Sequence, residues 1–214
     1  KEYSLNNTQK NLEIISKASK PKWIELLKRL NTVSEGTLRL VRLRERITSL
    51  KKDNPNLAFF DASLLDLFKH WFNPSFLVLQ KIDWATPANI LEKIIAYEAV
   101  HEINSWDDLR ARLEPEDRRC FAFFHPLIPN EPLIFVEVAL SNNMPESIKE
   151  VIKIDRSVTL DQDINTAIFY SISNCQEGLS GISFGNFLIK NVAHQLKQEI
   201  EGLNRFATLS PAPG

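Results

Sequence analysis

Residues 174–190 read NCQEGLSGISFGNFLIK and join a strand pattern to a helix pattern through a glycine-containing loop. The preceding residues 166–173, TAIFYSIS, are dense in β-branched and aromatic side chains, which predicts a strand. After the loop, apolar residues recur at the spacing of one helix face: Phe184, Phe187, Leu188, Val192 and Leu196. Glycines let backbone N–H groups approach an anion closely, and a helix N-terminus adds partial positive charge. The segment therefore predicts a phosphate cradle.

The spacing within this loop disfavours two common nucleotide-binding motifs. The glycines do not follow Gly-x-Gly-x-x-Gly, and no Lys-Ser or Lys-Thr pair follows them as in a P-loop. A Rossmann cofactor and a nucleoside triphosphate are thus disfavoured ligands. The alternative in which the glycines serve only the packing of a strand–loop–helix turn stays open.

A hairpin and several helices are predicted upstream of the loop. Residues 119–124 (RCFAFF) and 133–140 (LIFVEVAL) flank a turn rich in Pro, a pattern typical of an antiparallel hairpin. Glu137 lies among apolar neighbours, and we interpret it as a solvent-facing residue of strand alternation rather than a catalytic acid. Thr86 and Ser105 are predicted N-caps of two helices, and a further helix is expected near residues 145–152.

The first 70 residues are predicted to form a helical bundle. Helical periodicity covers residues 23–30, 37–52 and 64–72. Residues 1–70 carry 14 Lys and Arg against 8 Asp and Glu, whereas residues 71–214 carry 12 against 19, which predicts two structural units. The basic residues, which include Arg39, Arg42, Arg44 and Arg46, alternate with apolar ones. We therefore expect a solvated basic face and no nucleic-acid partner.

The composition indicates an ordinary globular protein. The chain has 214 residues, of which 43% are hydrophobic and 25% charged, enough for one large domain or two small ones. No apolar run approaches the roughly 18 residues that cross a bilayer, so no membrane partner is expected. Cys120 and Cys175 lie in apolar sequence without metal-ligand spacing. We expect buried, reduced thiols, a cytoplasmic location and no bound metal.

The loop resembles the pyrophosphate loop of the GNAT acyltransferase fold, which holds coenzyme A. Gln176, Gly178 and Gly181 are the counterparts of the Gln or Arg and the two small residues in that loop. The gap between the two glycines is one residue longer than in the usual GNAT pattern, which indicates a divergent branch.

Longer motifs resemble the malonyl-CoA decarboxylase family over nearly the whole chain. They are Trp71–Asn73, Ile82–Trp84, Tyr97–His101, His125–Leu140, Ala167–Lys190 and Thr208–Pro211. The resemblance implies an α+β fold in which a helical N-terminal oligomerisation domain, residues 1–73, precedes a partial GNAT-like mixed α/β domain, residues 74–214. We expect this second domain to be the first part of a catalytic domain that is truncated at the C-terminus.

The resemblance also implies a reaction and a site. The full-length protein is expected to convert malonyl-CoA to acetyl-CoA and CO2 through a thioester enolate that is then protonated. The thioester carbonyl itself receives the electrons, so no cofactor is expected, and coenzyme A is part of the substrate. Ser210, in a Leu-Ser-Pro motif, is the catalytic residue that matches the family. The CoA pyrophosphate loop comprises Gln176, Glu177, Gly178, Leu179, Ser180, Gly181 and Ile182.

The histidine that the family is thought to use belongs to a His-x-x-Asn-Gly-like segment, which we expect beyond Gly214. The four histidines within the chain, His125 included, are interpreted as structural or exposed residues. Two other functions stay open: a GNAT-like acyltransferase, and a non-catalytic protein that binds or assembles around CoA esters. In each case we expect a homo-oligomer formed through the helical domain.

Overall fold

The computed structural model describes residues 9–19, 21–153, 156–159 and 163–209. The chain divides into two compact units, residues 1–64 and 65–214, which we term the helical unit and the sheet unit. Helices make up the first, and helices with a mixed sheet make up the second, so the predicted α+β class is confirmed. The division falls inside helix α5, whereas the sequence places the domain boundary after residue 73.

Two of the helices that periodicity predicts lie in the helical unit, the third spans the division between the units, and one further helix is present. The elements of the helical unit are α2 (Gln9–Ser19), α3 (Lys22–Asn31), α4 (Gly36–Leu50) and the first half of α5 (Leu57–Trp71). Leu27 of α3 is buried, but Leu26 is 56% exposed, so the apolar face of this helix is covered only in part. The additional helix, α2, buries none of its residues.

One basic residue of the predicted solvated face is instead buried. Arg44 is 4% exposed, and its Nε lies 2.9 Å from Oδ1 of Asp61, whose Oδ2 lies 2.6 Å from Nζ of Lys51. Burial by itself would raise the pKa of Asp61, yet the hydrogen bonds and charges of Lys51 and Arg44 outweigh it, and the pKa lies below its ordinary value. Arg39, by contrast, is exposed as predicted.

The sheet unit is built on a five-stranded sheet in the order β1-β2-β3-β4-β5. The first three pairings are antiparallel, and β4 and β5 are parallel. The predicted hairpin and the strand before the loop are confirmed as β2–β3 and β4, whereas the edge strand β5 was not predicted. The strands are β1 (Val78–Ile82), β2 (Arg118–Phe124), β3 (Ile134–Ser141), β4 (Thr166–Asn174) and β5 (Arg205–Thr208).

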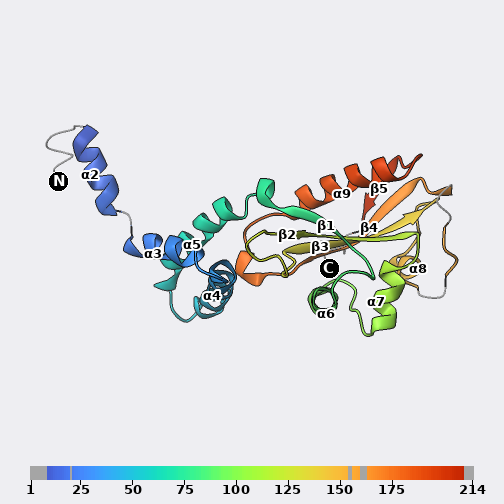
Figure 1. Ribbon diagram of the computed structural model, residues 1–214, viewed down its shortest axis with the longest axis horizontal. Coiled ribbons are helices and arrows are strands. Elements are labelled where there is room, and N and C mark those ends of the chain that lie inside the picture. The colour runs from blue at the N-terminus through green and yellow to red at the C-terminus, as the bar shows by residue number, and fades with distance from the viewer. Residues whose placement is uncertain (1–8, 20, 154–155, 160–162, 210–214) are drawn as a thin grey trace. The chain divides into compact units, whose positions relative to one another are not determined.

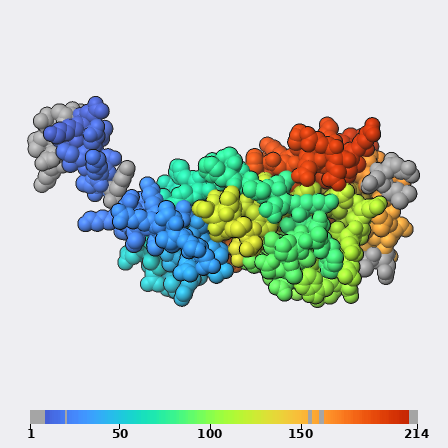
Figure 2. All heavy atoms as spheres, viewed as in Figure 1, coloured from blue at the N-terminus to red at the C-terminus, as the bar shows by residue number. Residues whose placement is uncertain are grey.

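Helices cover both faces of this sheet. Figure 1 shows α9 along one face and α6 with α7 on the other, and in Figure 2 the red atoms of α9 and the green atoms of α6 and α7 form opposite sides of the unit. Because both faces are covered, β2, β3 and β4 are buried along nearly their whole length. The helices are α6 (Ala88–Tyr97), α7 (Trp106–Leu113), α8 (Ile148–Ile152) and α9 (Gly185–Glu199).

The two predicted N-caps have different outcomes. Ser105 caps α7 as expected, since its side chain accepts a hydrogen bond from the amide of Asp108 at 3.1 Å. The assignment of Thr86 is wrong, because its Oγ1 accepts from the amide of Asp83 at 3.0 Å and Pro87 occupies the N-cap position of α6. Among the described helices, none is long and apolar enough to span a membrane.

A register shift between β3 and β4 lies next to the last of the described β4–β5 pairs. Glu137 of β3 pairs with Ser171, but the next residue, Val138, pairs with Phe169, so Tyr170 bulges out of the ladder. The parallel pairing with β5 covers only residues 166–169 of β4. Residues 170–174 therefore continue beyond the described part of β5 and lead directly into the glycine-containing loop.

Candidate functional site

The loop between β4 and α9 is fastened at its start to the segment before β3. The amide of Cys175 donates to the carbonyl of Leu133 at 3.0 Å. The side chain of Gln176 donates through Nε2 to the carbonyl of Pro132, also at 3.0 Å. Gln176 thus positions the loop through its side chain.

A single turn of 3-10 helix, η3 (Glu177–Leu179), uses several of the loop amides. The amides of Leu179, Ser180 and Ile182 donate to carbonyls within the loop at 2.9–3.1 Å. Gly181 then takes a φ of +89°, which L side chains rarely adopt. Steric room is not the constraint there, since an added Cβ would meet only Leu65 methyls, at an ordinary 3.5 Å. The turn therefore requires glycine for its backbone conformation.

Helix α9 begins without a side-chain cap. Phe184 occupies the N-cap position, and the first turn carries no acidic residue. The first helical hydrogen bond runs from the amide of Leu188 to the carbonyl of Phe184 at 2.9 Å. In the described part of the chain, no group accepts from the amides of Gly185, Asn186 and Phe187, so three donors at a positive helix end remain for an anion.

The position of this helix end is fixed by packing. The predicted apolar face is confirmed, because Phe184, Leu188, Val192 and Leu196 are all at most 2% exposed. Phe187 is 38% exposed, and its ring stacks on that of Phe123 with the centroids 5.5 Å apart. The helix N-terminus is therefore held against the sheet before any ligand arrives.

Ser210 lies outside the described residues, which end beside it. Leu209 donates its amide to the carbonyl of Phe169 at 3.0 Å and packs against Ala139, Val151, Ile168 and Tyr170. This contact follows the last β4–β5 pair, Phe169 with Thr208. The described chain thus ends one residue beyond the last β4–β5 pair.

His125 has a structural role, in keeping with its interpretation from the sequence. It is 6% exposed, its Nδ1 accepts from the amide of Leu127 at 3.2 Å, and its Nε2 lies 3.1 Å from the carbonyl of Trp71. Burial lowers the pKa of His125 below its ordinary value, which favours the neutral ring. Both ring nitrogens are occupied in this way. His194 is exposed, as expected.

The interpretation of Glu137 as a solvent-facing residue is wrong. Glu137 is fully buried, and its Oε2 lies 3.2 Å from Nη1 of Arg112 on α7. Burial raises the pKa of Glu137 to about 7, although the nearby charge of Arg112 acts in the opposite direction. Alternation implies an outward face only where one face of a sheet is open, and here α6 and α7 cover the face that Glu137 points to.

Sequence reasoning missed a second buried carboxylate, Glu98. It accepts hydrogen bonds from the hydroxyls of Ser171 and Ser173, on the strand that ends at the loop. The only available signal was that Glu98 and the serines occur in motifs that match one family. Both cysteines are buried free thiols, as expected. In the described ranges, no group of three or more His, Cys, Asp or Glu residues could hold a metal ion.

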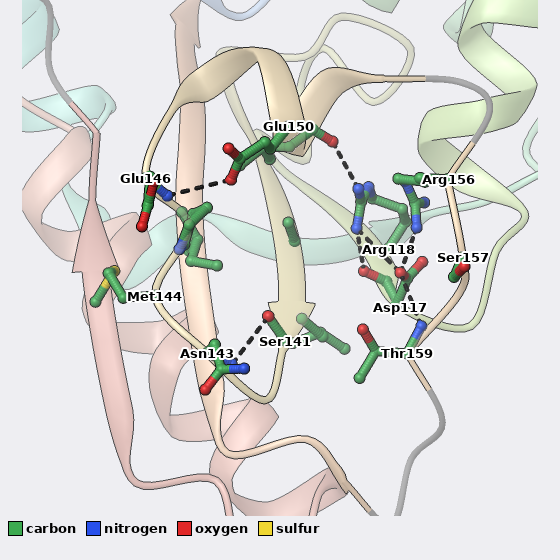
Figure 3. A pocket seen from close by; sticks show the side chains of 15 residues that line it. Asp117, Arg118, Ser141, Asn143, Met144, Glu146, Glu150, Arg156, Ser157 and Thr159 are labelled. Atoms are coloured by element: carbon green, nitrogen blue, oxygen red, sulfur yellow. Dashed lines mark hydrogen bonds and ion pairs between the residues drawn. The ribbon is translucent and has the colours of Figure 1, made fainter.

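A cavity of about 390 Å³ lies at the other end of the sheet, beside Ser141 at the end of β3. In Figure 3, Arg118 and Arg156 converge on Asp117 at one side of this cavity, and Asn143 and Met144 lie at the other. Both arginines are paired with Asp117, and Glu146 and Glu150 also line the cavity, so its positive and negative charges largely cancel. No residue of the predicted pyrophosphate loop lines the cavity.

A five-stranded mixed sheet, a glycine-containing loop and a helix without a side-chain cap define an α+β domain with a candidate anion-binding loop. Family models identify the family: residues 75–214 match the malonyl-CoA decarboxylase C-terminal domain, and residues 1–72 match the N-terminal domain of the same family. The chain belongs to the malonyl-CoA decarboxylase family.

Individual relatives agree with this assignment. The mitochondrial malonyl-CoA decarboxylase of Anser anser anser is 38% identical over 200 residues, which cover 91% of this chain and 40% of the relative. Crystal structures of malonyl-CoA decarboxylases from Rhodopseudomonas palustris and Agrobacterium vitis superpose on the whole chain with TM-scores of 0.95 and 0.93, at 50% and 51% identity. The chain spans 52% of each of these two structures.

Proposed function

We propose that the full-length protein decarboxylates malonyl-CoA to acetyl-CoA and CO2. Membership of the family supports the reaction, and the relatives that carry this name support malonyl-CoA as substrate. The observation that carries the proposal is the turn at Gly181 followed by three available amides at the start of α9. This arrangement can bind a polyanion such as the pyrophosphate of coenzyme A.

Within this proposal, residues 176–182 form the pyrophosphate loop, and two parts of this loop have different roles. The hydrogen-bonded turn from Gln176 to Ser180 gives the loop its shape, and the positive φ of Gly181 turns the chain toward α9. The amides of Gly185, Asn186 and Phe187 then donate to phosphate oxygens. The remainder of the acyl-CoA runs along residues 170–174 of β4, which the described part of β5 leaves unpaired.

The reaction breaks the bond between the malonyl carboxylate carbon and the central carbon. Its electron pair moves to the thioester carbonyl, CO2 leaves, and the resulting enolate takes a proton at carbon. We propose that Ser210 contacts the malonyl carboxylate or relays the proton, and that the proton donor is a histidine from outside residues 1–214. No metal or separate cofactor is required, because the thioester itself receives the electrons.

The test of the reaction is release of CO2 from malonyl-CoA by the full-length protein without an acyl acceptor. Acetyl-CoA and CO2 in equal amounts are the expected products. An acyltransferase would need an acceptor, and a CoA-ester-binding protein would bind without turnover. Either of these results would overturn the proposal.

We also propose that the protein forms a homo-oligomer through its helical unit. Large apolar side chains there are exposed, among them Leu26, Val33 and Phe59, at 55–62%. Such side chains are typical of an interaction surface. A monomer in light scattering of the full-length protein would contradict this.

A cytoplasmic location is supported by the two free thiols, although the goose relative is named mitochondrial.

Replacing Gly181 with Val is expected to weaken CoA binding at least about tenfold, because valine at a φ of +89° distorts the turn that leads into α9. Gly202, just beyond the other end of α9, has a φ of +90° and is the matched control. Gly202→Val imposes comparable backbone strain away from the loop and should leave the affinity within about threefold of wild type. Calorimetric titration with CoA measures both. Unchanged affinity in Gly181→Val would refute the pyrophosphate assignment.

A further inference from the structure

Glu98 is a buried carboxylate at the C-terminal end of α6, and it is 9% exposed. Its Oε1 accepts from the amides of Val100 and His101 at 2.9 and 2.8 Å, which closes the turn that leaves the helix. Among the hydrogen bonds found in the described residues, every donor to Glu98 is a neutral group. A buried carboxylate held in this way requires each of its donors to be well placed.

The remaining donors come from β4. The hydroxyl of Ser171 lies 2.7 and 2.8 Å from the two carboxylate oxygens of Glu98, and the hydroxyl of Ser173 lies 3.2 Å from Oε2. Ser173 in turn accepts from the amide of Ala99 at 3.2 Å. Both serines are 1% exposed. Glu98 therefore ties the turn 98–101 to the last part of β4.

The hydrogen bonds of Glu98 hold the part of β4 that follows the bulge. Ser171 and Ser173 belong to residues 170–174, which follow the bulge at Tyr170 and have no partner on the described part of β5. On its other side this stretch pairs with β3, and Ser171 faces Glu137 across that pair. Arg112 is already engaged by Glu137, so the hydroxyls are the groups that hold Glu98 against β4.

We propose that Glu98 is a positioning residue that fixes residues 170–174 of β4 for the acyl-thioester end of the substrate. The inference rests on the proposed function, in which the acyl-CoA runs along these residues from the pyrophosphate loop. The pyrophosphate is held elsewhere, by Gly181 and the first turn of α9. Loss of Glu98 should therefore misplace the reacting carbons while binding of the nucleotide end persists.

The test compares Glu98→Ala and Glu98→Gln in the full-length protein. Glu98→Ala is expected to lower kcat at least about tenfold while the Kd for CoA stays within about threefold of wild type. Glu98→Gln should retain kcat within about threefold, because the amide oxygen replaces Oε1 as acceptor and the amide nitrogen can donate to a serine hydroxyl. Rescue by glutamine is thus part of the expected result.

Asp117→Ala supplies the matched control. Asp117 is a carboxylate that is 2% exposed, at the opposite end of the same sheet, and it should affect stability but not kcat per folded molecule. Equal kcat losses in Glu98→Ala and Asp117→Ala would reduce Glu98 to a structural residue. Full kcat in Glu98→Ala, or a loss of CoA affinity in place of kcat, would also overturn the inference. If wild-type protein released no CO2, the proposed function would fail first, and the inference with it.

Discussion

Replacing Arg112 with Met should lower the free energy of unfolding by about 3–5 kcal/mol. The guanidinium holds Glu137 through Nη1 at 3.2 Å and donates to the carbonyls of His101 and Glu102 at 2.7 and 3.0 Å. Methionine fills a similar volume but leaves a fully buried carboxylate and two carbonyls without these donors. Urea unfolding followed by circular dichroism measures the change.

The pH dependence of this loss distinguishes the ion pair from simple packing. Burial raises the pKa of Glu137 to about 7, above its ordinary 4.5, so the folded state holds a proton that the unfolded state has released. The contribution of Glu137 to the free energy of unfolding is therefore fully present below about pH 4.5, and it is lost as the pH rises through 7. The Arg112→Met defect should therefore be smaller at pH 5, where Glu137 is protonated, than at pH 8.

Arg110 provides the control for Arg112. It lies on the same helix, half exposed, with partners at 3.6–3.8 Å, so Arg110→Met should cost about 1 kcal/mol or less. The double variant Arg112→Met/Glu137→Leu should recover part of the loss, because it removes the buried charge as well. Equal effects of the Arg110 and Arg112 variants would show that the buried pair contributes nothing specific.

Local sequence patterns predicted most elements of the sheet unit but not the fate of its charged residues. The density of β-branched and aromatic residues identified β2, β3 and β4, because that signal resides within each strand. The exposure of Glu137 depends on α6 and α7, which pack over β3 from elsewhere in the chain. Arg44 was misassigned for the same reason, since its partner Asp61 lies on another helix. Strand β5, at four residues, is too short to carry a pattern.

The candidate site was predictable in outline, because its loop and helix are contiguous in sequence. Gly181 and the apolar face of α9 follow from residue spacing alone. The availability of individual amides does not: Leu179, Ser180 and Ile182 donate within the loop, and the available donors lie further on, at the start of α9. The Glu98 cluster joins residues more than 70 positions apart, so periodicity gives no indication of it.

Replacing Ser210 with Ala in the full-length protein should lower kcat for malonyl-CoA decarboxylation by about 100-fold or more. A hydroxyl that contacts the malonyl carboxylate or relays a proton acts in the chemical step, where such groups contribute about 10²–10⁴-fold. The neighbour of Ser210 in sequence, Leu209, donates its amide to the carbonyl of Phe169 on β4, next to the proposed path of the acyl group. Steady-state kinetics with a CO2 readout measures the loss.

A comparison of kcat with the Kd for CoA distinguishes the role of Ser210 from that of the pyrophosphate loop. Ser210→Ala should leave the Kd for CoA within about threefold of wild type, whereas Gly181→Val should raise it, because the pyrophosphate and the malonyl group are bound by different segments. Ser49→Ala, in the helical unit, is the control for serine removal, since within the described residues its hydroxyl donates to the carbonyl of Arg46 on an exposed surface. Unchanged kcat in Ser210→Ala would remove the hydroxyl from the chemical step. A weaker affinity with normal kcat would instead make Ser210 a binding residue, and the carboxylate contact would then act equally in the ground state and the transition state.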